Sequence, residues 1–387
     1  MHMSAEKIRG KVIYVFMAAG RFGLNVIYLF HKLCPVKNRI AIVSRQSDVP
    51  YADLGMLKDE ISRLSPDTEV IISCRMIGEG ISGKISYLMH LVTTQMHLFA
   101  TSKAVILDTY CISASMLRHK KKLKIIQMWH AMGAFKRFGY SALDDAEGRS
   151  SVIAKGMCMH RNYDVVFISS EACRKPMAQS FGCREEMLEV MPLPRVDLLK
   201  DKALQQQTAE KIRSAYPQII GKRVILYAPT FRKSGKVPDY AKQLIDAADD
   251  KNICLVVKLH PIDREKITAE NAIIDDRFSS LEWLSTADDV ITDYSAFIYE
   301  AAAAGKCIYR YVPDDADYDQ QRGFLVDIRK EFPFFYSGDP EQVLQAAASG
   351  RCDPEALQRF TDKYICPGEN YTGAMASYIL ALTDTDQ

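Results

Sequence analysis

The sequence predicts an α/β protein built from two domains that face each other across a cleft. From residue 38 onward, short runs rich in Val and Ile alternate with helix-like stretches. This alternation is typical of βαβ units, which form parallel sheets. The chain has 387 residues, more than a single domain usually holds. The polar segment 201–218 separates two sets of strand candidates, so we place the domain boundary near residue 200.

The predicted elements follow in order along the chain. Residues 1–37 form a basic and apolar N-terminal helix, residues 38–200 the first domain, and residues 201–387 the second domain with a C-terminal helix. The strands expected in the first domain are 39–44, 69–74, 103–108, 123–129 and 164–170. The strands expected in the second domain are 222–229, 253–261, 288–293 and 306–312.

The composition is that of an ordinary soluble enzyme. Hydrophobic residues make up 48% of the chain and charged residues 25%, which excludes a mainly disordered, collagen-like or coiled-coil protein. The net charge of +2 gives no overall attraction for nucleic acid, so we expect no nucleic-acid partner. The ten cysteines include no C-x-x-C pair, and several lie in apolar runs. We therefore expect small core residues in a reducing cytoplasm, not a zinc site.

The N-terminal segment has its own character. Residues 12–30 are mostly apolar. Positions 1–40 contain seven Lys and Arg residues but only one acidic residue, Glu6. The apolar stretch is long enough to span a bilayer, but Arg21 and Asn25 near its middle make spanning costly. We expect an amphipathic helix lying on the cytoplasmic face of the membrane as a peripheral contact. The alternative is a core helix packed on the first domain.

A second basic cluster lies at residues 119–124, directly after Arg118. It offers a second lipid contact, with a solvated loop as the alternative.

Polar side chains follow several of the predicted strands. In parallel sheets, ligands bind beyond the carboxyl ends of the strands, so these positions are the site candidates. In the first domain they are His130 and Ser170, and in the second Thr230, Arg232, His260, Asp293 and Ser295. If the two sheets face one cleft, these residues meet in one site.

The segment 288–312 predicts a complete strand–turn–helix–strand unit. Its first strand ends at Asp293, Ser295 is a good N-cap, and Gly305 ends the helix. The amide groups near Ala296 and Phe297 would form an anion site suited to a pyrophosphate. The alternative is a capped helix that binds nothing.

Two histidines carry the chemical hypothesis. His260 lies in KLHP and His130 in WHAMGAFKRFG, each at a strand end of a different domain. An imidazole with a near-neutral pKa can transfer a proton or donate to a phosphate. Lys136 and Arg137 follow His130, and Arg232 offers a planar fork for phosphate oxygens.

Two weaker patterns suggest other kinds of site, a phosphate-binding loop and a metal site. The segment GEGISGKI at residues 78–85 nearly matches a phosphate-binding loop, but Ile85 replaces the hydroxyl that would hold magnesium. A flexible glycine turn is the alternative. Asp315 and Asp317 could hold a metal, although acidic turns are common, and we predict no essential metal ion.

A set of ordered motifs resembles the CDP-glycerol glycerophosphotransferase family, the teichoic-acid primases and polymerases of Gram-positive bacteria. The resemblance covers about residues 38–385, and the short chain is more similar to the primases. Each motif is weak alone, and together they are specific. They are WHAMGAFKRFG (129–139), ISSE (168–171), LPRVD (193–197), YAPTFR (227–232), KLHP (258–261), ITDYSAFIYEAAAAGK (291–306), and the spaced residues Asp314, Tyr318 and Arg322 to Phe324.

The resemblance implies a GT-B-type fold of two Rossmann-like domains. It implies a transferase that moves an alditol phosphate from CDP-glycerol or CDP-ribitol to a lipid-linked saccharide and needs no cofactor. The paired family histidines match His130 and His260. The family usually has glycine after the first histidine, where this chain has Ala131, which leaves the acceptor open. Under the resemblance, the pyrophosphate contacts match Asp293, Ser295 and the backbone after them, including Ala296, and Arg232 and Arg322 fall near donor phosphates. From their positions in the sequence, we add Thr230 on the donor side and Lys136, Arg137 and Ser170 on the acceptor side.

The expected mechanism has His130 as general base on the acceptor hydroxyl. His260, Arg232 and the helix start at Ser295 would neutralise the pyrophosphate and the leaving CMP. Three alternatives stay open: a GT-B glycosyltransferase that uses a nucleotide sugar, a non-catalytic scaffold docked on the membrane, and an ATPase based on residues 78–85.

Overall fold

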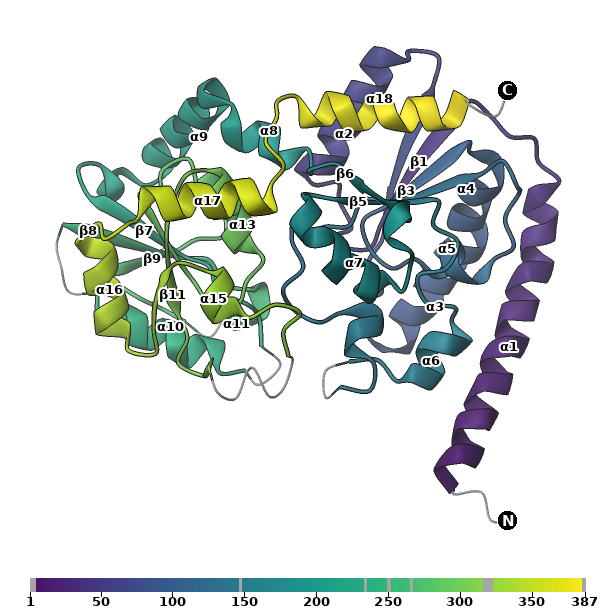
Figure 1. Cartoon of the computed structure of the whole chain (residues 1–387), viewed down its shortest axis with the longest axis horizontal. Coiled ribbons are helices and arrows are strands. Elements are labelled where there is room, and N and C mark those ends of the chain that lie inside the picture. The colour runs from purple at the N-terminus through teal and green to yellow at the C-terminus, as the bar shows by residue number, and fades with distance from the viewer. Residues whose placement is uncertain are drawn as a thin grey trace. The chain divides into compact units, whose positions relative to one another are not determined.

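The chain folds into two compact α/β units, seen in a computed structural model that describes residues 5–145, 148–232, 235–248, 252–264, 267–315 and 323–384. The first unit comprises residues 1–195 together with 368–387, and the second comprises residues 196–367. Within the described residues, each unit contains one parallel sheet of six strands (Figure 1). The structure therefore confirms the predicted α/β class.

The first sheet has the strand order β2-β1-β3-β4-β5-β6. Its central strands β1, β3 and β5 are buried along their whole length, as expected of runs of Val, Ile and Ala covered on both faces. The strands are β1 (Arg39–Ser44), β2 (Glu69–Cys74), β3 (Ala104–Leu107), β4 (Lys124–Gln127), β5 (Val165–Ile168) and β6 (Leu188–Val190).

The helices of the first unit lie before, between and after these strands in the sequence. They are α1 (Ala5–Lys32), α2 (Ala52–Leu64), α3 (Gly80–His90), α4 (Met96–Thr101), α5 (Ile112–Met116), α6 (Ser151–Gly156), α7 (Arg174–Phe181) and α18 (Tyr371–Asp384). The helix α8 (Arg195–Lys200) begins at the last residue of this unit before the chain enters the second.

The second sheet has the strand order β12-β11-β10-β7-β8-β9. Read from the other edge, this is the order 3-2-1-4-5-6 of the doubly wound dinucleotide-binding fold. The strands are β7 (Arg223–Tyr227), β8 (Ile253–Val257), β9 (Ala272–Ile274), β10 (Asp289–Thr292), β11 (Cys307–Tyr311) and β12 (Phe335–Ser337).

Helices pack on this sheet and complete its core. Ile225, Val257, Ile291 and Tyr309 from the strands share one buried cluster with Leu244 of α10. The helices are α9 (Lys202–Ala215), α10 (Val237–Asp246), α11 (Pro261–Arg264), α12 (Ser280–Trp283), α13 (Phe297–Ala303), α15 (Ile328–Glu331), α16 (Pro340–Ala348) and α17 (Pro354–Tyr364).

Three strands were not predicted from the sequence. β6, β9 and β12 have three residues each, and each lies at the edge of its sheet. An edge strand of three residues is covered less completely than a central strand, so its sequence lacks a long run of Val and Ile.

The C-terminal helix corrects the predicted domain assignment. We placed it in the second domain, but α18 packs on α2 of the first unit (Figure 1). Its buried residues include Met375, Ala376 and Ile379, and the Tyr378 ring lies 5.6 Å from that of Phe167. Burial of this apolar face holds the end of the chain on the first unit.

The N-terminal helix α1 combines one anchored side with one exposed apolar side. It packs on α4 and α6 and lies along the outside of the first unit (Figure 1). Tyr28 is buried, whereas Phe16, Phe22 and Phe30 are 74%, 72% and 69% exposed. By length and composition, the stretch Arg9–Lys32 could cross a membrane.

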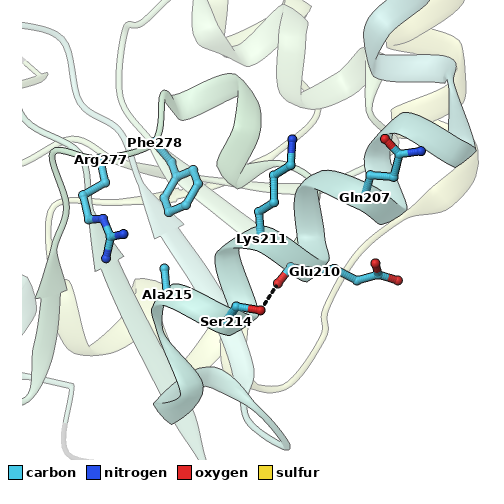
Figure 2. A pocket seen from close by; sticks show the side chains of 7 residues that line it. All are labelled: Gln207, Glu210, Lys211, Ser214, Ala215, Arg277 and Phe278. Atoms are coloured by element: carbon cyan, nitrogen blue, oxygen red, sulfur yellow. Dashed lines mark hydrogen bonds between the residues drawn. The ribbon is translucent and has the colours of Figure 1, made fainter.

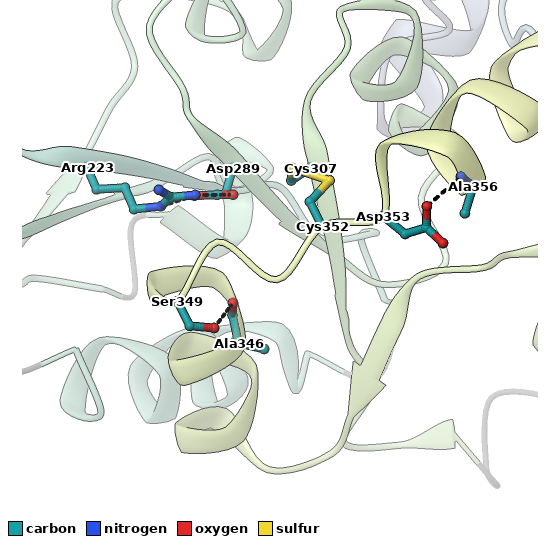
Figure 3. The surroundings of a disulfide bond; sticks show 8 residues. All are labelled: Arg223, Asp289, Cys307, Ala346, Ser349, Cys352, Asp353 and Ala356. Atoms are coloured by element: carbon teal, nitrogen blue, oxygen red, sulfur yellow. Dashed lines mark hydrogen bonds and ion pairs between the residues drawn. A yellow bond between two sulfur atoms is a disulfide. The ribbon is translucent and has the colours of Figure 1, made fainter.

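One cysteine pair departs from the prediction that the cysteines are free core residues. Cys352, between α16 and α17, forms a disulfide with Cys307 at the start of β11 (Figure 3). The two residues are 45 positions apart, so no local spacing indicates the bond. The other eight cysteines are free thiols.

Candidate functional site

Each sheet has a point at which the strand order reverses, and predicted polar residues follow the strands next to this point. In the first sheet, β1 lies between β2 and β3, and in the second, β7 lies between β8 and β10. Ligands of open α/β sheets bind beyond the carboxyl ends of the strands at such a switch point. Asp108 directly follows β3, and Asp293 directly follows β10. Each unit therefore has a candidate binding edge of its own.

His130 is positioned by its Nδ1 atom. This nitrogen lies 3.0 Å from the carbonyl oxygen of Asp108. A carbonyl oxygen only accepts hydrogen bonds, so Nδ1 carries the hydrogen, and the neutral ring keeps a lone pair on Nε2. Burial lowers the pKa of His130, which favours this neutral form. The arrangement is that of a base held ready in one tautomer.

The carboxyl group of Asp108 organises the first switch point. Its Oδ2 accepts hydrogen bonds from Ser44 Oγ at 2.5 Å and from Tyr51 OH at 2.9 Å. Burial raises the pKa of Asp108, and its Oδ1 is buried without a hydrogen-bond partner among the described residues. Sequence reasoning missed this residue as a partner of His130. The available signal was its position at the end of a buried strand.

Trp129 sets the direction of the chain at His130. Its φ of 57° lies in the left-handed region, which costs a bulky residue about 1–2 kcal/mol. Its amide donates to Gln127 Oε1 at 2.9 Å, and its ring stacks on Phe138 with the centroids 4.7 Å apart. These contacts hold the strained backbone, and no sequence pattern indicated it.

Arg195 of the LPRVD motif is a structural residue of the first unit. Its side chain donates to Asp53 Oδ2 at 2.5 and 2.8 Å, and its amide donates to Asp53 Oδ1 at 2.7 Å. Its positive charge also lowers the pKa of His130, after the larger effect of burial.

The predicted acceptor-side residues have different surroundings. Ser170 is buried, with its Oγ 3.7 Å from Cys173 Sγ. Arg137 forms an ion pair of 3.7 Å with Asp145, and Lys136 Nζ lies 5.7 Å from the centre of the Phe135 ring.

The second switch point is a buried cluster around Asp293. Its Oδ1 accepts from the amide and the hydroxyl of Thr230 at 2.9 and 2.8 Å, and its Oδ2 accepts from Arg232 at 2.5 Å. Arg232 also donates to both oxygens of Asp314, at 2.6 and 3.0 Å. Although burial alone would lower the pKa of Arg232, the two carboxylates raise it. The guanidinium predicted to receive phosphate oxygens is thus engaged by carboxylates in this structure.

The turn after β10 keeps two amide groups available. Ser295 Oγ accepts from the Phe297 amide at 3.3 Å, so this amide is engaged, contrary to the prediction. The amides of Ser295 and Ala296 donate to no other group in the described part of the chain. The helix α13 begins at Phe297, so these two amides precede it.

His260 is an exposed side chain of the second unit. It follows β8, and its carbonyl oxygen accepts from the amides of Asp263 and Arg264 at 2.9 Å, which starts α11. Its ring lies 4.7 Å from that of Phe231. His130 belongs to the first unit, and the structure places each histidine within its own unit.

Three residues named in the sequence analysis, Asp317, Tyr318 and Arg322, lie outside the described residues. Asp315, the second acid of the proposed metal pair, accepts from Tyr294 OH at 2.7 Å and from Arg329 at 2.5 Å. Among the residues that the structure describes, no group of three His, Cys, Asp or Glu side chains is arranged to hold a metal ion.

The glycine-rich segment 78–85 does not form a phosphate-binding loop. The helix α3 begins at Gly80, so most of the segment is helical. A phosphate-binding loop needs this stretch as open backbone ahead of the helix.

A cavity of about 680 Å³ lies on the second unit, between α9 and the segment before α12 (Figure 2). Its lining includes Lys211, Glu210 and Arg277 but none of the predicted site residues.

Comparison with known proteins identifies the family. A family model described as CDP-glycerol:poly(glycerophosphate) glycerophosphotransferase matches residues 27–368. The chain is 29% identical over 366 residues to the teichoic acid ribitol-phosphate primase of Bacillus spizizenii, covering 92% of this chain and 94% of the relative. It is 32% identical over 247 residues to the teichoic acid glycerol-phosphate primase of Bacillus subtilis, covering 62% of each chain.

The solved structures agree with the predicted fold. The wall teichoic acid polymerase TagF superposes with a TM-score of 0.73 at 17% identity, covering 100% of this chain and 98% of TagF. The UDP-GlcNAc 2-epimerase of Methanocaldococcus jannaschii gives a TM-score of 0.56 at 12% identity, covering 89% of this chain and 99% of the epimerase. These likenesses confirm the GT-B-type fold of two Rossmann-like domains. With the family match over most of its length, the chain belongs to the CDP-glycerol:poly(glycerophosphate) glycerophosphotransferase family.

Proposed function

We propose that this protein transfers an alditol phosphate, glycerol phosphate first, from a CDP-alditol to a hydroxyl of a lipid-linked cell-wall saccharide and releases CMP. The observation that carries the proposal is the fixed tautomer of His130 at the switch point of the first sheet. Family membership supports the same chemistry.

In the proposed reaction, the acceptor oxygen attacks the β-phosphorus of the donor. A new P–O bond forms, the bond to CMP breaks, and the hydroxyl proton moves to Nε2 of His130. Because Nδ1 donates to Asp108, Nε2 is the nitrogen that can take this proton. Phosphoryl transfer needs positioning and charge neutralisation more than covalent help, so we propose no cofactor and no essential metal ion. Unchanged CMP release in the presence of a chelator would agree with this.

The second unit would hold the donor. We propose that His260 and the free amides of Ser295 and Ala296 contact the pyrophosphate, with Arg322 nearby. Thr230, Arg232 and Asp293 bond to one another, so they would fix the shape of the binding turn. Lys136 and Arg137 would face the acceptor.

The test is CMP release by His130→Ala and His260→Ala variants. Loss of a general base costs about 10²–10⁴ in rate, so we expect a fall in kcat of that size for His130→Ala. His97→Ala, a histidine on α4, is the matched control. If both site variants turn over like the control, the proposal is wrong.

CDP-ribitol is the second candidate donor. The relative that this chain matches over 94% of its length is a ribitol-phosphate primase. Mass spectrometry of products from CDP-glycerol and CDP-ribitol, with a synthetic lipid-linked disaccharide as acceptor, separates the two donors. Release of UDP or GDP from nucleotide sugars would instead support a glycosyltransferase, and binding without turnover a scaffold.

We further propose a peripheral location on the cytoplasmic face of the membrane. The exposed apolar side of α1, with Phe16 and Phe30, supports this contact. A Phe16→Ser/Phe30→Ser variant is expected to lose binding to vesicles of any charge. Equal binding by this variant would contradict the location.

A further inference from the structure

A basic cavity of about 620 Å³ lies between α1 and the body of the first unit. Four cationic side chains line it: Arg21 and Lys32 from α1, Arg118 after α5, and Arg161 before β5. No Asp or Glu is among the described residues of the lining. Four positive charges around one cavity repel each other, so the site favours an anionic ligand.

These cations are not neutralised by neighbouring acids. Arg21 donates to Cys158 Sγ at 2.7 Å, and Lys32 Nζ donates to the carbonyl oxygen of Arg118 at 3.2 Å. Arg118 and Arg161 are exposed and form no ion pair within the described chain. Two free guanidinium groups provide the planar donor pairs that phosphate oxygens accept.

The cavity is held in shape by Asn25. Its Nδ2 donates to the carbonyl oxygen of Met116 at 3.0 Å, and its Oδ1 accepts from the Arg118 amide at 2.8 Å. The hydroxyl of the buried Tyr28 lies 3.2 Å from His119 Nδ1. Because both walls are joined by these bonds, the cations are positioned before a ligand arrives. This also explains a polar residue in the middle of an apolar helix.

An exposed apolar surface continues from the cavity. Phe22, Val26 and Leu29 line it, and each is exposed. Phe30 and Leu33 extend the exposed apolar surface of α1 beyond it. A free phosphate ion gains nothing from such a surface, whereas a lipid gains from both, because its headgroup binds the cations and its chains cover the apolar residues.

We propose that this cavity binds the phosphate headgroup of an anionic membrane lipid. The inference rests on the membrane contact proposed for α1 and adds a site that selects lipids by charge. Cys158, which accepts from Arg21, belongs to a loop that also contacts Trp129, the residue before His130. It has positive φ at Cys158 and His160, and the His160 ring lies 6.4 Å from that of Trp129, next to His130. Arg161, which lines the cavity, directly follows His160, so the cavity adjoins the loop that packs near the proposed base.

The test is vesicle co-sedimentation of the full chain. Vesicles contain phosphatidylcholine alone or with phosphatidylglycerol, and the variant is Arg118→Gln/Arg161→Gln. The matched control, Arg184→Gln/Arg213→Gln, removes the same charge from two other exposed arginines. Each cation near an anionic surface strengthens binding about fivefold. The cavity variant lacks two, so we expect it to bind phosphatidylglycerol vesicles about thirtyfold more weakly. The control should bind nearly as the unmodified protein does.

Any other result of the vesicle experiment overturns the inference. Equal losses in the two variants would show bulk charge attraction, and no loss would show that the cavity is not used. If inorganic pyrophosphate competes with the vesicles and binds through the same arginines, the ligand is a free phosphate. Thermal unfolding checks that both variants are folded, and Arg118→Lys/Arg161→Lys should recover most of the binding. If the unmodified protein binds no vesicle, the membrane contact fails as well, whereas CMP release tests the chemistry independently.

Discussion

The carbonyl oxygen of Asp108 lies 3.0 Å from Nδ1 of His130, and this contact decides which imidazole nitrogen can act as a base. The two residues follow neighbouring strands, β3 and β4, so the sheet itself sets their distance. Because the acceptor is a main-chain oxygen, the tautomer of His130 does not depend on the protonation of another side chain.

The first prediction concerns pH. Burial lowers the pKa of His130 from its ordinary value near 6.5, so the ring stays neutral to lower pH than a free histidine. We expect kcat/KM for CMP release to fall on acidification with a midpoint below 6.5 and to be level above it. The measurement is a pH profile from about 5 to 8. A midpoint above 6.5 would contradict the role of the buried His130.

The second prediction concerns the left-handed backbone at Trp129. Both Trp129→Ala and Trp129→Gly lose the ring contacts with Phe138, which costs about 3 kcal/mol. Glycine, however, adopts a φ of 57° without the Cβ penalty. We expect the glycine variant to be more stable than the alanine variant by about 1 kcal/mol. Urea denaturation measures the difference, and a more stable alanine variant would refute it.

The third prediction concerns the ion pairs of Arg232. Replacing it by Met leaves the buried carboxylates of Asp293 and Asp314 without a counter-charge, which lowers the free energy of unfolding by about 3–5 kcal/mol at pH 7. Arg232→Met/Asp314→Asn should lose less than Arg232→Met. Urea denaturation at pH 7 compares the two variants, and equal losses in both would exclude this cause.

The fourth prediction concerns the disulfide. The bond closes a loop with a sequence separation of 45, so the oxidised protein should be about 2–4 kcal/mol more stable than Cys352→Ser. With a reducing agent, the two proteins should unfold alike. Urea denaturation in both conditions is the measurement, with Cys183→Ser, a free thiol, as control. A difference that persists after reduction would point to packing instead.

The long strands were predictable because almost all their residues are buried on both faces of the sheet. β1, β8 and β10 are buried along almost their whole length, so Val, Ile and other apolar residues make up their interiors. Polar residues at their ends therefore stood out, and Asp293 was found in this way. Strands of three residues give no such run, which is why β12 was missed.

Residue chemistry alone did not predict how the polar groups are partnered. Arg232 suits a phosphate, but Asp293 and Asp314, 61 and 82 residues away, occupy its guanidinium. In the sequence, Arg21 and Asn25 only indicated that the apolar helix would span a membrane at a high cost. In the structure, both side chains bond to the first unit. Each outcome depends on contacts between distant segments, and a pattern within one segment does not contain them.

The path of the chain has a practical consequence for dissecting the enzyme. Because residues 368–387 return to the first unit, the polypeptide passes from one unit to the other twice. Stopping translation after residue 195 would expose the surface of α2 that α18 covers, which favours aggregation. An autonomous N-terminal half would need the last twenty residues joined to it through a short linker, whereas the other half can be excised as one continuous stretch.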